Sequence, residues 1–157
     1  MTPLHLAAAN GHLSVVEYLV NQKADINAKG NDDLTPLHFA AANGHLSVVE
    51  YLVNQKADIN AKNEDNITPL HLAAEKGNLS VVEYLVNQKA GINAKDKNDC
   101  TPLHFAANNG HLSVVEYLVN QKADINAKNK DGKTPLKVSN KKGKSHVFEF
   151  LKRKGGK

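Results

Sequence analysis

A chain of 157 residues, of which 41% are apolar and 23% charged, has the size and composition of one globular domain with a substantial core. It has no apolar run near the roughly 18 residues that span a bilayer, no signal-peptide pattern, and one cysteine, Cys100, so we expect a cytoplasmic or other intracellular location and no membrane association. The net charge of +4 divides into −5 over residues 1–127 (9 Lys/Arg, 14 Asp/Glu) and +9 over residues 128–157 (11 and 2), so the basic character belongs to the C-terminus.

The tetrapeptide TPLH is written four times and its variant TPLK once, always 33 residues apart. The five copies begin at Thr2, Thr35, Thr68, Thr101 and Thr134. Between them GHLSVVEYLVNQKADINAK recurs almost letter for letter, with GNLSVVEYLVNQKAGINAK at 77–95. A fixed period of this length predicts a solenoid of stacked units, because each unit then has the same neighbours.

The unit that begins at Thr35 shows what each period should form. Thr35 is a good N-cap and Pro36 suits the first helical position, so LHFAAAN predicts a short helix that Gly44 ends. HLSVVEYLVNQ predicts a second helix, because its apolar residues recur at i, i+3, i+4 and i+7. The Asn- and Asp-rich KADINAKNEDNI predicts a β-hairpin finger. The small Ala40 and Ala41 should bring first helices closer together than second helices, which would curve the stack.

These motifs resemble the ankyrin repeat over essentially the whole chain. The combination of TPLH, GH, a V-V-x-x-L helix, A-D-I-N-A and a period of 33 is highly specific. The resemblance implies a mainly α ankyrin-repeat solenoid of helix-turn-helix units with β-hairpin fingers, and a family role in protein–protein recognition without catalysis. We expect a single domain, 1–157, with a partial repeat at 1–29, full repeats at 30–62, 63–95 and 96–128, and a C-terminal capping repeat at 129–157.

Two features depart from the family pattern. Lysine stands where the family has glycine at the end of the second helix, and a left-handed lysine should cost roughly 1 kcal/mol; the positions are Lys23, Lys56, Lys89 and Lys122. The finger glycine survives only as Gly132, and its replacements, Asp33, Asn66 and Asp99, are types that tolerate positive φ.

The last unit differs from the fourth in ways that suit the end of a stack in water. Ala106 and Ala107 become Ser139 and Asn140, Leu112 becomes Ser145, and Val119 becomes Lys152. The chain begins inside a unit, at Thr2, which suits either a fragment of a longer array or an array with a frayed first repeat. The basic C-terminus leaves open a nuclear location or nucleic-acid binding. We favour a solubilising cap without nucleic acid, because Phe148 and Phe150 fill packing positions rather than base-stacking ones.

The repeated histidines, His5, His38, His71 and His104, raise the question of a metal site. The resemblance implies that adjacent repeats lie about 10 Å apart, too far for two imidazoles to share an ion whose bonds are about 2 Å long. The family resemblance implies instead that each imidazole, with the threonine hydroxyl, ties neighbouring turns together. Lys137 replaces the fifth histidine while the rest of the motif stays. We therefore expect no metal and no cofactor.

No arrangement typical of an enzyme is visible. No base is fixed beside Cys100 by the sequence, and the chain lacks a Gly-rich phosphate loop and a G-x-S-x-G motif. Carboxylates such as Asp32 and Asp65 fall at finger tips without a calcium-loop pattern. We predict a protein that is not an enzyme and has no small-molecule substrate.

Variation between units gathers at the finger tips and at the ends of the first helices, positions that line the concave, partner-binding face in the family. The candidate partner-binding residues are Asn31, Asp32, Leu34, Glu64, Asp65, Ile67, Glu75, Lys76, Lys97, Asn98, Cys100, Asn108 and Asn109.

Two functions remain open from the sequence. One is a monomeric interaction module that binds a protein partner on the concave face. The alternative is an engineered or structural scaffold, or a spacer, with no specific partner, because solvent-facing residues such as Ser14, Glu17 and Gln22 are also repeated. Strong interfaces centre on Trp, Tyr or Arg, yet the chain has no Trp and one Arg. Phe39 and Phe105 are expected to belong to the core.

Overall fold

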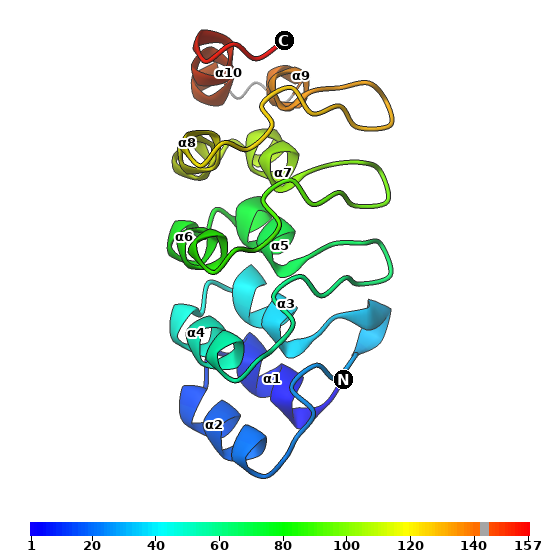
Figure 1. Ribbon diagram of the computed structural model, residues 1–157, viewed down its shortest axis with the longest axis vertical. Helices are drawn as coiled ribbons and strands as arrows, with labels where there is room; N and C mark the ends of the chain where they lie inside the picture. The colour runs from blue at the N-terminus through cyan, green and yellow to red at the C-terminus, as the bar shows by residue number, and fades with distance from the viewer. Residues whose placement is uncertain (142–144) are drawn as a thin grey trace.

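The computed structural model describes residues 1–141 and 145–157 and shows a stack of five helix pairs (Figure 1). A short 3₁₀ turn, η1 (Asn31–Asp33), lies in the first finger, and the described residues contain no strand. The prediction of a mainly α repeat solenoid is therefore confirmed. The pairs are α1 (Pro3–Ala9) with α2 (Leu13–Asn21), α3 (Pro36–Ala42) with α4 (Leu46–Asn54), α5 (Pro69–Lys76) with α6 (Leu79–Asn87), α7 (Pro102–Asn109) with α8 (Leu112–Asn120), and α9 (Pro135–Lys141) with α10 (Ser145–Arg153).

Each first helix begins at the predicted Thr-Pro, and α5 shows how such a helix starts and ends. Thr68 is the N-cap of α5, Pro69 takes the first helical position, and the side chains of Thr68 and His71 form a reciprocal capping box. Gly77 then adopts a left-handed conformation with φ 74° and ends the helix. The same arrangement of Thr, Pro and His opens α1, α3 and α7.

The stack has three rows, which Figure 1 shows side by side: the fingers, the first helices and the second helices. The core lies between the two helical rows, where Leu70, Val82 and Leu85 are fully buried, as are their counterparts in the neighbouring units. First helices of adjacent units pack against each other more extensively than second helices do. Ala40 and Ala41 are fully buried at this contact, which is what their small size predicts.

Hydrogen bonds repeated once per period hold neighbouring units in register. The asparagine of ADINA accepts a backbone N–H from the next unit: Asn27 from Asp58 at 2.9 Å, Asn60 from Gly91 at 2.8 Å and Asn93 from Asp124 at 2.8 Å. In units two to four, the residue before the second helix donates back to the preceding unit: His45 to the Ala9 carbonyl at 3.0 Å, Asn78 to the Ala41 and Ala42 carbonyls, and His111 to the Glu75 carbonyl at 2.8 Å. Each unit is therefore stabilised by its neighbours rather than by its own short helices.

The fingers are tight turns rather than extended strands. Each closes with two backbone bonds, such as Asn63 N–H to the Ile67 carbonyl at 3.1 Å and Asn66 N–H to the Asn63 carbonyl at 3.0 Å. One further bond joins neighbouring fingers, such as Lys97 N–H to the Asp65 carbonyl at 2.8 Å. The predicted left-handed positions are confirmed, with φ of 64–70° at the four helix-end lysines and 59–60° at Asp33, Asn66 and Asp99.

One substitution in the last unit does not face water as predicted. Ser139 is fully buried, and its hydroxyl donates to the Leu136 carbonyl at 2.7 Å, so the helix itself satisfies the polar atom. Lys152 is exposed, as predicted. The side chains of Asn140 and Ser145 lie outside the described residues, and the capping role of 129–157 stays a prediction. Within residues 1–141 and 145–157, no helix combines the length and the hydropathy needed to cross a bilayer.

Candidate functional site

The candidate residues chosen from the sequence lie in the finger row and at the ends of the first helices, and none of them is buried. The finger residues are Asn31, Asp32, Leu34, Glu64, Asp65, Ile67, Lys97, Asn98 and Cys100, and the helix-end residues are Glu75, Lys76, Asn108 and Asn109. The structure brings only some of them together around a single hollow.

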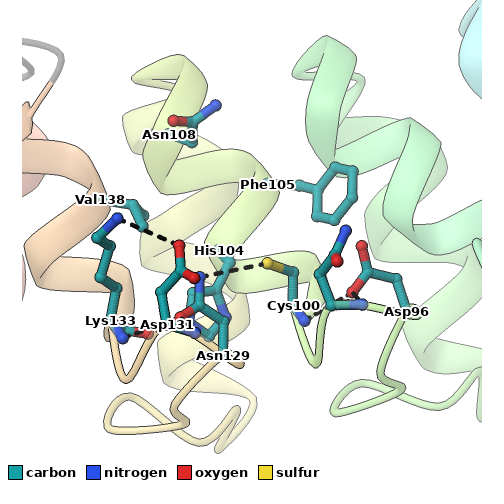
Figure 2. Close-up of a pocket in the computed structure, with 10 residues that line it drawn as sticks. Asp96, Cys100, His104, Phe105, Asn108, Asn129, Asp131, Lys133 and Val138 are labelled. Carbon is teal, nitrogen blue, oxygen red and sulfur yellow. Dashed lines mark hydrogen bonds and ion pairs between the residues drawn. The ribbon is translucent and has the colours of Figure 1, made fainter.

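That hollow, of about 340 Å³, lies between the fingers and first helices of the fourth and fifth units (Figure 2). Of the predicted residues, Asn98, Cys100 and Asn108 line it. The side chains of Phe105 and Val138 give it an apolar wall. Asp96, His104, Asn129, Asp131 and Lys133 complete the lining.

The sequence prediction for the two phenylalanines is wrong in one respect. Phe39 and Phe105 are half-buried rather than part of the fully buried core. They belong to a column of apolar residues, one per unit on the first helices, that all keep exposed surface: Leu6, Phe39, Leu72, Phe105 and Val138. The rings also pack edge-on against histidines of the preceding unit, His5 to Phe39 at 5.8 Å and His71 to Phe105 at 5.2 Å between ring centroids. The recurrence of an aromatic or aliphatic residue after TPLH was the signal that could have identified this column.

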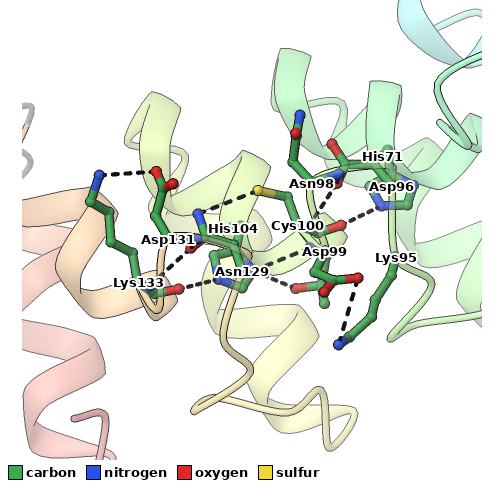
Figure 3. A network of polar contacts seen from close by, with 11 residues as sticks. His71, Lys95, Asp96, Asn98, Asp99, Cys100, His104, Asn129, Asp131 and Lys133 are labelled. Carbon is green, nitrogen blue, oxygen red and sulfur yellow. Dashed lines mark hydrogen bonds and ion pairs between the residues drawn. The ribbon is translucent and has the colours of Figure 1, made fainter.

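Polar bonds hold the finger turns around the hollow in fixed positions (Figure 3). The Asp96 carboxylate accepts the backbone N–H groups of Asn98 at 2.8 Å and Cys100 at 2.7 Å. The Asn129 side chain accepts those of Asp131 at 3.1 Å and Lys133 at 2.9 Å in the next finger. These bonds already fix the backbone of each turn. Binding through the tip side chains would therefore cost little further backbone entropy.

Other candidate residues are engaged in local contacts away from the hollow. Asn109 donates to the Phe105 carbonyl at 2.9 Å and so helps to end α7. Glu75 and Lys76 form an exposed ion pair at 3.2 Å. Lys97 and Asp65 pair at 3.4 Å across neighbouring fingers. Exposed pairs of this kind contribute little to stability, so these charges remain free to meet a partner.

Comparison with known proteins identifies the family. The model described as "Ankyrin repeats (3 copies)" matches residues 1–63 and 70–157, and a second, "Ankyrin repeats (many copies)", matches residues 44–86. The chain belongs to the ankyrin-repeat family. Ankyrin repeats are generally protein-interaction modules and are typically non-catalytic.

Two curated proteins from Latrodectus tredecimguttatus match one repeat length of the chain. Alpha-latrocrustotoxin-Lt1a is 58% identical over 33 residues, and alpha-latroinsectotoxin-Lt1a is 64% identical over 33 residues. Each match covers 21% of this chain and 2% of the relative. The chain therefore spans a small fraction of these proteins, and the similarity concerns the ankyrin repeat itself.

The four histidines of the ankyrin motif are fully or almost fully buried, and both ring nitrogens of each are hydrogen-bonded. In the third unit, Thr68 N–H donates to His71 Nδ1 at 3.2 Å, and His71 Nε2 donates to the Cys100 carbonyl at 3.1 Å. Nδ1 is thus an acceptor and the ring is neutral. Burial lowers the pKa of His38, His71 and His104 below the ordinary histidine value, while carbonyl contacts partly oppose the shift. The imidazoles thus link neighbouring turns, as the family resemblance implies.

Neither a metal cluster nor an activated thiol is found in the described part of the chain. No group of three or more His, Cys, Asp or Glu side chains there could hold a metal ion. Burial raises the pKa of the Cys100 thiol, the Asn129 amide partly offsets this, and Asp96, Asp131 and Asp99 raise it further. A protonated, half-buried thiol is a small apolar contact rather than a nucleophile.

The aromatic residues near the C-terminus pack against the helix pair. Phe150 is 7% exposed and Phe148 is half-buried. Lys152 lies 5.9 Å from the Phe148 ring centroid, and Arg153 lies 5.8 Å from that of Phe150. Phe150 is therefore largely covered, whereas Phe148 is covered in part.

Proposed function

We propose that this ankyrin domain, as a monomer, binds a protein partner on the concave face formed by the finger turns and the first helices. The column of half-exposed apolar residues carries the proposal. Phe39, Leu72 and Phe105 provide apolar surface that the fold leaves uncovered, and the hollow beside Phe105 can hold a side chain of the partner. Interfaces typically combine such an apolar centre with a polar rim.

The finger charges would form that rim. Asp65 and Lys97 lie at exposed tips, where charged groups set orientation and association rate more than affinity. Ile67 and Cys100 are the apolar residues of their finger tips, and both side chains are half-buried. An intracellular location is part of this proposal, because the chain's single cysteine has no second cysteine with which to form an internal disulfide bond.

The experiment compares proteins captured from a cell lysate by the wild-type chain and by single variants, with quantitative mass spectrometry. Ile67→Lys and Cys100→Lys place a charge at the finger tips. The fifth unit already has Lys133 at the same position, where His104 still donates to its carbonyl at 3.0 Å and Asn129 still accepts its N–H, so both variants should fold.

The matched control is Glu50→Gln on α4, in the row of helices opposite to the fingers (Figure 1). It changes the net charge by the same amount as Ile67→Lys. A partner of the concave face should be lost with the finger variants and retained with Glu50→Gln. The opposite pattern would place the binding face on the second helices and contradict the proposal.

A scaffold or spacer without a specific partner is the second candidate. It is favoured by one observation: Ser47, Ser80 and Ser113, all exposed, are identical from unit to unit although no packing constrains them. If no protein distinguishes the wild type from the finger variants, this second function is the better account.

A further inference from the structure

The hollow between the fourth and fifth units lies where two side chains are smaller than their counterparts in earlier units. Val138 stands in the apolar column where each earlier unit has leucine or phenylalanine. Cys100 stands where earlier fingers have Leu34 and Ile67. The space of about 340 Å³ beside Phe105 is large enough to receive one long side chain of a partner.

A buried carboxylate reaches this hollow with one of its two oxygens unused. Asp96 lines the hollow and is 8% exposed. Its Oδ1 accepts the backbone N–H groups of both Asn98 and Cys100, and Figure 2 shows the other oxygen facing away from the Cys100 N–H. Within residues 1–141 and 145–157, no donor is bonded to Asp96 Oδ2. Because no fully buried side-chain oxygen or nitrogen of these residues lacks a partner, Oδ2 retains solvent-accessible surface.

The finger turn does not require the negative charge of Asp96. Asn63 and Asn129 occupy the same position in the neighbouring fingers, and the side-chain oxygen of each accepts the same pair of backbone N–H groups. The carboxylate therefore adds an acceptor and a charge that the turn leaves unused. Because a buried carboxylate is costly unless it is paired, Asp96 is suited to meet a donor that a partner brings.

The other charged groups of the lining do not neutralise Asp96. Lys133 Nζ lies 3.2 Å from Asp131 Oδ2, so these two charges offset each other. The neutral ring of His104 donates to the Lys133 carbonyl at 3.0 Å and adds no charge. Two carboxylates and one ammonium give the lining a net charge of −1, which favours a cation.

We propose that the hollow binds an arginine side chain of the protein partner, an inference that rests on the proposed function of the concave face. The guanidinium donates to Asp96 Oδ2, and its flat face and alkyl stem pack on Phe105 and Val138. Arginine fits better than lysine, because a guanidinium is more weakly hydrated, has five donors in one plane and stacks on aromatic rings. Asn98 and Asn108, which also line the hollow, offer amide oxygens to the remaining donors.

A purely apolar occupant fits the hollow less well. It would exclude water from Asp96 without supplying a donor, and a carboxylate oxygen would then be buried unpaired. An acidic side chain would meet the net negative charge of the lining. The charge of the partner's side chain is therefore the property that the experiment varies.

The experiment titrates the full chain with short peptides and follows its backbone amides by heteronuclear NMR. The probe is acetyl-Gly-Gly-Arg-Gly-Gly-amide, and its controls replace the arginine by citrulline, lysine or leucine. Citrulline has nearly the shape of arginine without its charge. The amide signals of Cys100, Phe105 and Asn129 should shift and saturate with the arginine peptide, with a dissociation constant on the order of 1 mM. The three control peptides should bind about tenfold more weakly or worse.

Asp96→Asn is the central variant, because Asn63 and Asn129 show that the turn forms with asparagine. It should bind the arginine peptide about tenfold more weakly than the wild type and lose the preference over citrulline. The matched control is Asp99→Asn, which makes the same charge change in the same finger. Asp99 does not line the hollow, and Asn66 has the same left-handed conformation one unit earlier, so this variant should bind like the wild type.

Three results would overturn the proposal. The first is that the arginine peptide gives no saturable shifts. The second is that the citrulline, lysine or leucine peptide binds as tightly as the arginine peptide. The third is that Asp96→Asn binds the arginine peptide as the wild type does.

The lysate capture separates this inference from the proposed function. A partner that Ile67→Lys loses and Asp96→Asn retains would leave the proposed function intact and overturn the assignment of the hollow to arginine. Binding of the arginine peptide without any captured partner would support the arginine site and contradict the proposed function.

Discussion

Acidification should destabilise this chain at a pH where its carboxylates are still ionised. His38, His71 and His104 have pKa values lowered by burial. In each, Nδ1 faces a threonine backbone N–H, at 3.1 Å, 3.2 Å and 3.1 Å respectively. The threonine hydroxyl also lies beside Nδ1 and could accept a proton added there, so burial is the main reason that the native fold resists protonation.

The sign of the effect follows from the direction of these shifts. Above pH ~6.5 the three side chains are neutral in both states and contribute no pH dependence. Below it the unfolded chain binds protons that the native chain does not, so the free energy of unfolding falls as pH falls toward the native pKa values. Between pH 6.5 and 5.5 each unfolded-state histidine gains about 1 kcal/mol from protonation, so the three together remove up to ~3 kcal/mol.

Urea denaturation followed by far-UV circular dichroism measures this dependence. The denaturation midpoint should fall steadily between about pH 7 and 5.5 with little change in the slope against urea. The variant His71→Gln, which has no titrating ring, should show about two-thirds of the wild-type dependence. A midpoint that is constant or rises over this range would refute the reasoning, since the native state would then accept the protons.

Three further predictions follow from the backbone and the histidine contacts. Lys89→Gly should raise the free energy of unfolding by roughly 0.5–1 kcal/mol, because the lysine has φ 66°; a loss of stability in urea denaturation would contradict this. Gly77→Ala should lower it by about 2 kcal/mol or more, because an added Cβ would lie 2.5 Å from the His111 ring. Gly132→Ala, with φ 70° and no atom within 4 Å of the new Cβ, should cost only about 1 kcal/mol, and equal losses would show that the His111 contact does not matter. Excess EDTA should leave the melting temperature unchanged, because hydrogen bonds occupy both ring nitrogens of the buried histidines, and a chelator-dependent drop would contradict this.

The helices, their ends and the left-handed residues could be predicted from the sequence because short-range chemistry determines them. A Thr-Pro pair such as Thr68 and Pro69 starts the first helix of a unit, and Gly77 ends α5. Lys89 was predicted to be left-handed because the family places glycine there, and its φ of 66° agrees. A perfect period also determines which units touch, so the stacking order needed no further information.

The apolar column and the hollow were harder to predict, because they depend on the rotation of each first helix about its own axis. Phe105 was predicted to belong to the core, yet it is half-buried, whereas Leu103, two residues earlier on the same helix, is 1% exposed. An apolar pattern that covers only two helical turns is too short to distinguish a buried position from a half-buried one. The prediction for Ser139 was wrong for a different reason. It assumed that the hydroxyl faces water, whereas the hydroxyl donates a hydrogen bond to the Leu136 carbonyl inside the fold.

The asparagine and histidine bonds between units have a consequence for how such a gene can change length. Loss of the codons for residues 63–95 would join two tracts of nearly identical sequence. Asn60 would then meet the Asp124 amide in place of that of Gly91, and the Ala42 end of the first helix would meet His111 in place of Asn78. Both exchanges restore a bond that the chain already makes elsewhere. Recombination between the repeated tracts therefore adds or removes whole units without creating an unmatched junction.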